Sequence, residues 1–454
     1  MGLFGILAIA NQALEAQQTG LQISANNIAN VNTPGYTRQV VNLAEQAPFS
    51  SSIGSVGGVQ VAQIQSIRDS VLGIRINQET QTQSQLTSLQ QQLNPVQTMF
   101  SDQGGAGLGT AIDGFFNSLQ QLSTDPTDSA QRQAVITSAQ TMVQTFQQVA
   151  TGLTEQQTGA DQEVVQDVGQ ANTDLTQIAK LNGEIADVQN SNQNASELVD
   201  QRSTLLTGLS KLMDFNVSDG GSSQVTLTTA DGSPLVVGTS TTPLTLVSGG
   251  GGLHDVYSGA TDITASIAGG SLAGLIQARD QVLPQLSSQL DSLASGIASG
   301  INTLNAAGFT PTGAAGGNLF TPPPPTGAAG AMALATTDPN AIAASGDGTP
   351  GDNSNLLAMA ALQQQPIAAG QTPDNAYAGI ISTVGTVIAG ANTQQQASQL
   401  VLTQLQNQNS SISGVSLDEE SVLIDQFQSA YEAAARIVST VNTLTGLAIN
   451  LGKD

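Results

Sequence analysis

The chain of 454 residues contains no cysteine and no tryptophan, and its only histidine is His254. Without cysteine it cannot form disulfides, thiolate nucleophiles or thiolate-ligated zinc and iron–sulfur sites. A single histidine excludes a metal site built on a histidine pair within one chain, and a Ser-His-Asp triad would have to use His254. The side chains most used in catalysis are therefore nearly absent.

Charged residues are also scarce, at 10% of the chain, where about 25% is usual for a globular protein. The 34 acidic residues outnumber the 10 basic ones and give a formal net charge of −24. Nucleic acids and anionic membrane surfaces both attract clustered lysine and arginine. The sequence therefore predicts neither as a partner, and neutral polar side chains have to cover the surface.

Long apolar runs and the usual targeting signals are missing as well. No stretch of about 18 apolar residues could span a bilayer, and no lysine or arginine precedes Arg38, so the positive region of a secretory signal peptide is absent. Ile6 stands where a myristoylation motif has serine or threonine. We expect either a cytoplasmic protein or export by a route other than the general secretory pathway.

Both ends of the chain instead carry a stripe of mostly apolar residues in alternating steps of four and three. At the N-terminus these are Leu3, Leu7, Ala10, Leu14, Gln17, Leu21, Ser24, Ile28 and Val31. At the C-terminus they are Leu423, Phe427, Ala430, Ala434, Ile437, Val441, Leu444, Ala448 and Leu451. Such heptad spacing is typical of coiled coils. We expect the two terminal helices to pack on each other and to place both termini at one end of the molecule.

Local signals set the inner ends of these helices. Asn32-Thr33-Pro34-Gly35 should end the first one, because proline cannot continue a helix. Ser416 is a suitable N-cap for the second, and Glu419 would complete a capping box. The polar seam residues Gln17 and Ser24 would fix the register at a cost in stability. A short pair of this kind should be marginal alone, so we expect it to fold only within an assembly.

The middle of the chain favours more helices around one β insertion. Helical spacing covers residues 74–100, 107–122, 125–153, 160–190, 196–213, 271–305 with a kink at Pro284, and 372–411. Residues 214–267 contain short β-branched runs separated by glycine-containing turns, and 308–355 is expected to be a loop with a small hairpin. The predicted fold class is mainly α: an elongated helical bundle with paired terminal coiled-coil helices and a small outer β domain. The predicted domains are 1–35 with 414–454 as the inner helix pair, 36–213 with 268–413 as the bundle, and 214–267 as the outward-facing β domain.

One motif near the N-terminus is specific. Residues 25–36, with the sequence ANNIANVNTPGY, resemble the signature of the bacterial flagellar axial proteins, which build the rod, the hook and the hook-associated junction. Residues 413–420, SGVSLDEE, followed by Phe427-Gln428 and Ala430-Tyr431-Glu432-Ala433, are similar to the C-terminal motif of the same family.

Segments in the middle of the chain resemble one group of proteins within that family. Asp200-Gln201-Arg202, residues 278–285 with the sequence ARDQVLPQ, and Pro350-Gly351-Asp352-Asn353 are similar to the hook-associated members that join the hook to the filament. The chain is shorter than larger members in its β region, which suggests one outer β domain rather than two.

The resemblance implies a structural junction protein that is not an enzyme and needs no cofactor or metal. It implies a homo-oligomeric ring with hook protein below it, and a second junction protein followed by flagellin above it. It also implies an export chaperone bound at the C-terminal region. Export would proceed unfolded through the flagellar type III apparatus without a cleaved signal peptide, and the terminal helices would line the central channel of the extracellular flagellum.

The residues expected to form the assembly interface lie in the terminal stripes and in the asparagine-rich motif. A stripe of leucine and alanine cannot stay exposed in a stable monomer, and the amide-rich opposite faces can pack without desolvating ions. These residues are Leu7, Leu14, Leu21, Asn26, Asn27, Ile28, Asn30, Asn32, Pro34, Gly35 and Tyr36, and Leu423, Phe427, Ala430, Tyr431, Ala434, Ile437, Val441 and Leu444.

Other interpretations of these features stay open at this point. The stripes could form an ordinary intramolecular core, the asparagines could cap the helix, and Tyr36 could be a packed anchor with its hydroxyl bonded. Asp418, Glu419 and Glu420 fit the first turn of a helix through its macrodipole. His254 followed by Asp255 suggests a dyad, but no nucleophile elbow accompanies it. The glycine run at 249–252 lacks the lysine of a P-loop, and residues 348–355 lack calcium-loop spacing.

Rival functions follow from the same alternatives. The chain could be a surface adhesin or antigen that acts through the β insertion, or a wall hydrolase that depends on His254. It could also be another axial protein, from the hook or the distal rod.

Overall fold

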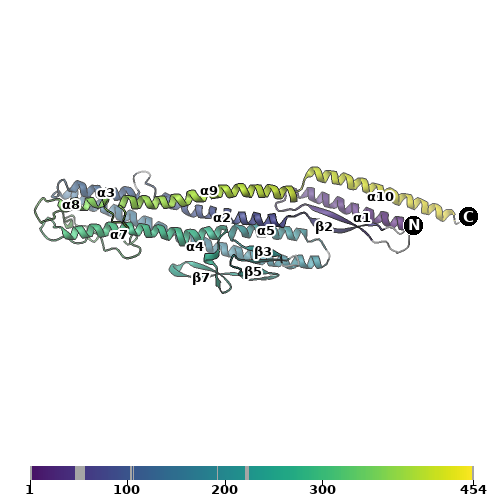
Figure 1. Ribbon diagram of the computed structural model, residues 1–454, viewed down its shortest axis with the longest axis horizontal. Helices are drawn as coiled ribbons and strands as arrows, with labels where there is room; N and C mark the ends of the chain where they lie inside the picture. The colour runs from purple at the N-terminus through teal and green to yellow at the C-terminus, as the bar shows by residue number, and fades with distance from the viewer. Residues whose placement is uncertain are drawn as a thin grey trace.

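The protein is a long rod of helices with both termini at one end (Figure 1). The computed structural model describes residues 3–46, 57–102, 105, 107–191, 193–219 and 224–451. Helices α3 and α8 lie at the end opposite the termini, and the β insertion lies along one flank (Figure 1). The prediction of a mainly α, elongated fold with paired terminal helices and a β insertion is confirmed.

The elements follow in the order that the helical spacing predicts, with additions. They are α1 (Leu3–Ala29), β1 (Gln39–Glu45), β2 (Val59–Ser66), α2 (Ser70–Met99), α3 (Leu108–Leu122), α4 (Ser129–Asn190), α5 (Ser196–Leu212), the β insertion, α6 (Gly270–Gln277), a π-helical turn η3 (Ala278–Val282), α7 (Leu283–Ala307), α8 (Ser354–Ala361), α9 (Pro373–Ser413) and α10 (Leu417–Leu451). The predicted kink near Pro284 takes the form of this π-helical turn, after which Pro284 lies in the first turn of α7.

Helix α4 is one continuous helix of 62 residues, so the prediction of separate helices over 125–153 and 160–190 is wrong. Its N-cap is Asp128, whose side chain accepts hydrogen bonds from the backbone N–H groups of Ala130 and Gln131. The segment between the predicted helices is polar but carries no proline. Its glutamines bond to neighbouring elements, since Gln156 Nε2 donates to Gln92 Oε1 and Gln157 Nε2 to the Arg279 carbonyl.

A hairpin before α2 and a short helix before α9 were not predicted from the sequence. Strands β1 and β2 form an antiparallel hairpin that packs beside α1, with a register shift between Asn42 and Leu43. The alternation of apolar and polar residues in these two strands is weak, because glutamine and asparagine occupy many of their positions. Helix α8 is only eight residues long and follows the predicted loop, in which Phe320 and Leu334 form an isolated β-bridge.

The β insertion consists of two small antiparallel sheets, in the orders β3-β4-β5-β6 and β7-β8-β9. The predicted runs correspond to β4 (Val225–Thr228), β5 (Pro234–Val237) and β7 (Leu244–Ser248). The further strands are β3 (Asn216–Asp219), β6 (Ser240–Thr241), β8 (His254–Ser258) and β9 (Thr261–Asp262). The new strands are short and pair with their sequence neighbours, so their side chains give little periodic signal.

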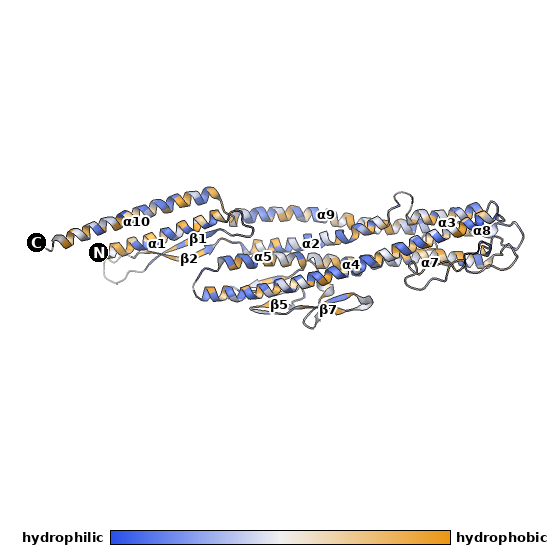
Figure 2. Cartoon of the chain, turned by 180° about the vertical axis from the view of Figure 1, so that it is seen from behind, coloured by the Kyte–Doolittle hydropathy of each residue, from blue (hydrophilic) through white to orange (hydrophobic). Residues whose placement is uncertain are grey.

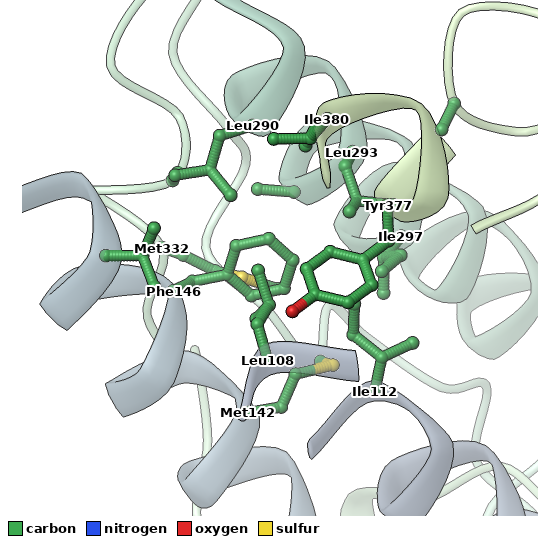
Figure 3. Packing of buried hydrophobic residues seen from close by; sticks show 14 of the residues in the cluster. Leu108, Ile112, Met142, Phe146, Leu290, Leu293, Ile297, Met332, Tyr377 and Ile380 are labelled. Atoms are coloured by element: carbon green, nitrogen blue, oxygen red, sulfur yellow. The ribbon is translucent and has the colours of Figure 1, made fainter. Parts of the chain in front are cut away.

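Two main apolar cores follow each other along the rod. The first lies at the end opposite the termini, between α2, α3, the first part of α4, α7 and α9. Figure 3 shows its centre, where Leu108, Met142, Phe146 and Tyr377 pack together, and the Tyr377 hydroxyl donates to the Phe100 carbonyl at 3.0 Å. The second joins the later part of α4 with α5, α6 and the β insertion. The insertion therefore shares its core with the rod.

Candidate assembly interface

Helices α1 and α10 pack on each other along most of their length, as predicted from the terminal stripes. The most buried residues of α1 are small or polar, namely Ala10, Ala16, Gly20, Ser24 and Asn27. Those of α10 are Glu420, Ala434 and Val441. Gly20 faces Phe427, and a Cβ atom at position 20 would lie 2.7 Å from ring atoms of Phe427. The two helices therefore meet along a line of small side chains.

The predicted N-terminal stripe is buried in part. Ala10 and Ser24 of the stripe are buried, whereas Leu7, Leu14, Leu21 and Ile28 are half-buried. A straight α-helix has 3.6 residues per turn, so a stripe with a strict heptad period drifts around it. The small residues allow a closer approach of the helix axes than a leucine seam would.

The C-terminal stripe is divided between the contact line and the outer surface. Leu423, Phe427 and Ala430 are half-buried, and Ala434 and Val441 are buried. In contrast, Tyr431 is 39% exposed, and Ile437 and Leu444 are each 47% exposed. Apolar side chains that are uncovered in the single chain also include Phe4, Leu417, Val422, Leu447 and Ile449. Figure 2 shows hydrophobic residues along both terminal helices. Such a surface marks a site of interaction with another molecule.

Asn27 lies in the last turn of α1, and its side chain bonds to the segment that follows the helix. Its side chain is fully buried, its Nδ2 donates to the Gln39 carbonyl at 2.9 Å, and its Oδ1 accepts from the Gln39 N–H at 3.0 Å. The Tyr36 hydroxyl donates to the same Oδ1 at 2.8 Å, and burial raises the pKa of Tyr36 to about 12. Gly35 has φ +80°, a conformation that glycine adopts readily. Tyr36 is thus a packed side chain with its hydroxyl bonded, as one interpretation of the sequence expected.

The other asparagines have different surroundings. Asn30 Nδ2 donates to the carbonyl and to the Oδ1 of Asn26, which secures the end of α1. Asn26, Asn32, Pro34 and Gly35 are exposed, so a neighbouring molecule can reach them.

A polar cluster holds the segment after this turn to the rod. The Thr37 backbone N–H and hydroxyl both donate to the Asp200 carboxylate on α5, and Arg68 Nη2 lies 2.7 Å from Asp200 Oδ1. Burial raises the pKa of Asp200, and the Thr37 hydrogen bonds and the Arg68 charge oppose that shift. Arg68 also donates to the Ser196 carbonyl at 2.9 Å.

Arg38 connects the same segment to the start of α10. Its Nε lies 2.7 Å from Glu420 Oε1 and its Nη1 2.6 Å from Glu419 Oε2. The Glu420 side chain is fully buried. The predicted N-cap is confirmed, since the Glu419 N–H donates to Ser416 Oγ at 3.4 Å. The Glu419 carboxylate pairs with Arg38, however, and does not complete the predicted capping box.

Sequence reasoning missed Gly20, Thr37, Arg38, Arg68 and Asp200 as parts of this region. Arg38 is the first basic residue of the chain, and an isolated cation in a nearly uncharged segment could have indicated an acidic partner. Glu420, the partner of Arg38, and Asp200, the partner of Thr37 and Arg68, both lie far away in sequence, so no spacing rule connects them to this segment.

His254 belongs to a buried clamp and forms no dyad with Asp255. Its Nδ1 lies 2.7 Å from Asp161 Oδ2 on α4, and Arg279 Nη1 lies 2.6 Å from Asp161 Oδ1. Burial acts to raise the pKa of Asp161, but the hydrogen bonds from His254 and Arg279 outweigh it and lower that pKa. Arg279 is 1% exposed. The clamp therefore links α4, β8 and the π-helical turn.

The described residues contain neither a metal-binding cluster nor a membrane-spanning helix. In the part of the chain that the structure describes, no group of three or more His, Cys, Asp or Glu side chains could hold a metal ion. No helix among these residues has the length and hydropathy that a membrane span requires.

Comparison with known proteins gives a consistent result. Residues 93–320 match the family model "Flagellar hook-associated protein FlgK helical domain", and residues 7–37 match "Flagella basal body rod protein". The chain is 29% identical to flagellar hook-associated protein 1 of Bacillus subtilis, with 98% of this chain and 97% of that protein covered. It is 27% identical to the Escherichia coli protein of the same name, with 97% and 98% covered. The solved structure of the flagellar hook junction protein FlgK from Burkholderia pseudomallei has the same fold, with a TM-score of 0.67 at 19% identity over 75% of this chain and 100% of that chain.

Proposed function

The chain belongs to the family of flagellar hook-associated proteins defined by the FlgK helical domain, and from this membership we propose that it joins the flagellar hook to the filament by self-assembly through its terminal helices. Its role is structural and it resides in the flagellum. Copies form a ring with hook protein below, and with a second junction protein and then flagellin above. The proposal includes no enzymatic activity.

The observation that carries this proposal is the uncovered apolar surface of the terminal pair. None of the apolar clusters within the described residues includes a side chain of α1 or α10. Ile437 and Leu444 are each 47% exposed and Leu447 is 55% exposed. Covering a half-exposed leucine or isoleucine contributes about 1 kcal/mol, so a row of them supports association with neighbouring molecules.

The charge pattern of α10 supports the same role. Its charged residues all lie between Asp418 and Arg436, and none of the described residues from Ile437 onward is charged. An uncharged apolar helix end can enter a packed tube without desolvating ions. The same surface would need a cover before assembly, which supports an export chaperone at this end and passage through the flagellar type III apparatus to the cell exterior.

A pair of aspartates on this surface tests the proposal. In a strain of the native bacterium without its own copy, the chain carrying Ile437→Asp and Leu444→Asp should be made and secreted but not retained in flagella. Swimming should be lost and flagellin should appear as monomer in the medium. The matched control, Val237→Asp with Val247→Asp, changes side chains that are 54% and 46% exposed on the β insertion. Normal motility of the α10 variant would contradict the proposal.

A further inference from the structure

Helix α9 is almost free of charge. Between Asp374 and Asp418 the chain contains no charged residue, and this stretch includes nearly all of α9. At the chain's average of 10% charged residues, a stretch of this length would carry several. The side of α9 that faces away from α2 and α7 is therefore neutral from Asn375 to Ser413.

This neutral face of α9 is shallowly hollowed and partly apolar. The hollow is lined by small and apolar residues, including Ile381, Gly385, Ala389, Gly390 and Ala397. Ile381 is 41% exposed and, further along the helix, Leu400 is 73% exposed. The small residues leave room for the side chains of another helix to approach the backbone.

A second neutral face lies on the first part of α4. From Ser129 to Thr154 the only charged residue is Arg132, which is 4% exposed and bonds to the carbonyls of Pro126 and Ile342. From Glu155 onward the same helix carries eight charged residues up to Asp187. The contrast within one helix shows that the neutral face is a local feature. Its exposed positions are Gln133, Thr137, Thr141, Gln144, Gln148, Thr151 and Thr154.

The two faces overlap in level over part of their length and lie on different helices of one core. Met142 of α4 and Tyr377 in the first turn of α9 pack in one cluster (Figure 3), and both helices run from there toward the end with the termini (Figure 1). Both α4 and α9 pack against α2, α3 and α7, so other helices of this core lie between them. A neighbour seated on α9 therefore does not block α4.

We propose that the neutral face of α9 in one copy of this chain packs against the neutral face of α4 in the next copy. This inference rests on the proposed function, to which it adds a second contact, outside the terminal helices. Two different faces of one chain can join identical subunits into a closed ring, because each copy offers α9 to one neighbour and α4 to the other.

Electrostatics favours a second copy as the occupant. Each copy carries a net charge of −24, so copies repel one another unless they meet where neither carries charge. Amide, hydroxyl and small apolar groups can be brought together there without the desolvation cost of buried ions. A partner of opposite charge would gain nothing from a neutral face.

Disulfide trapping tests the contact directly, because the chain has no cysteine of its own. Ser382→Cys on α9 is combined in turn with Thr137→Cys, Thr141→Cys, Gln144→Cys, Gln148→Cys and Thr151→Cys on α4, all at exposed positions. The variants replace the native copy in the bacterium, and flagella from motile strains are treated with an oxidant that accepts the electrons from the two thiols. At least one pair should give a ladder of dimers and larger species, and every single-cysteine variant should stay monomeric.

The outcomes separate this inference from the proposed function. Motile strains whose paired thiols all stay free would overturn the α9–α4 contact alone. Dimers of the Ser382→Cys single variant would also overturn it, since they would show α9 against α9. Absence of the wild-type chain from isolated flagella would instead contradict the proposed function. Ala389→Asp gives a second readout: it should abolish motility without changing the melting temperature of the free chain, and retained motility would count against the inference.

Discussion

Gly20 of α1 lies directly against the ring of Phe427 on α10. A methyl group at position 20 would sit 2.7 Å from the ring atoms Cε1 and Cζ. This contact brings together two residues from opposite ends of the chain and sets how closely the terminal helices approach.

Gly20→Ala should therefore weaken the terminal pair although alanine favours helix. The gain in helix propensity is about 1 kcal/mol, whereas overpacking of a close contact costs about 1–3 kcal/mol. We expect less of the chain to be retained in flagella and smaller swimming halos. Gly5→Ala is the matched control on the same helix, because a Cβ there meets nothing within 4 Å. Equal retention of both variants would show that the contact is unimportant.

Asn27→Ala should loosen the turn after α1. The substitution leaves the Gln39 N–H and carbonyl and the Tyr36 hydroxyl without their buried partner, at a cost of about 1–3 kcal/mol. Hydrogen exchange of the Gln39 amide in isolated flagella should become about tenfold faster or more. Asn32→Ala, at an exposed position, controls for loss of an asparagine in the motif. An unchanged exchange rate in Asn27→Ala would contradict the assigned role.

Asp167→Asn should stabilise the free chain at pH 7. Burial raises the pKa of Asp167 on α4, and the Glu163 charge adds to this, while a hydrogen bond from Ser271 opposes it. The folded state thus binds the proton more tightly than the unfolded state, whose aspartate pKa is about 3.9. Stability is highest below that value and falls as pH rises through the raised pKa.

The melting temperature of Asp167→Asn should exceed that of the wild type at pH 7, and the difference should shrink toward pH 4. Asp187→Asn removes the same charge from an exposed position of α4. If both variants change the melting temperature equally at pH 7, net charge and not burial is the cause.

Arg279→Ala should strongly destabilise the chain. Arg279 pairs with Asp161 and Asp280 and is 1% exposed, so its removal leaves the buried Asp161 carboxylate without its cation. Breaking a buried pair in this way costs about 3–5 kcal/mol. Urea denaturation of the free chain would measure the loss, with Arg75→Ala as the exposed control. A loss as small as that of the control would show that the clamp contributes little.

Periodicity predicted most of the helices because each buries one apolar stripe. Periodicity does not predict that α4 is continuous, because the stretch around Gln156 and Gln157 is polar and interrupts the apolar stripe. In the structure these glutamines bond to Gln92 and to the Arg279 carbonyl. Polar side chains can continue a buried face when their partners are near, and those partners lie on other elements.

The packing of α1 on α10 shows a different limit of prediction from sequence. The sequence contains the stripes that predict the pairing, but Gly20 and Ala16, which are more buried than Leu7, Leu14 and Leu21, lie outside the heptad positions. Which side of a helix contacts its partner depends on the twist of the pair and on residues that leave space. Likewise, the Asn27 hydrogen bonds and the Arg38–Glu420 pair depend on where the chain turns, and no local spacing specifies that.

The accessibility of Leu444 in free and assembled protein tests the assembly role of the terminal helices most directly. In a chain without native cysteine, Leu444→Cys provides a single thiol on the outer side of α10, and Val237→Cys provides one on the β insertion. A maleimide reagent should label both thiols in the free chain. In flagella isolated from motile cells it should label Val237→Cys but leave Leu444→Cys protected. Equal labelling of Leu444→Cys in the free and assembled states would contradict the assembly role.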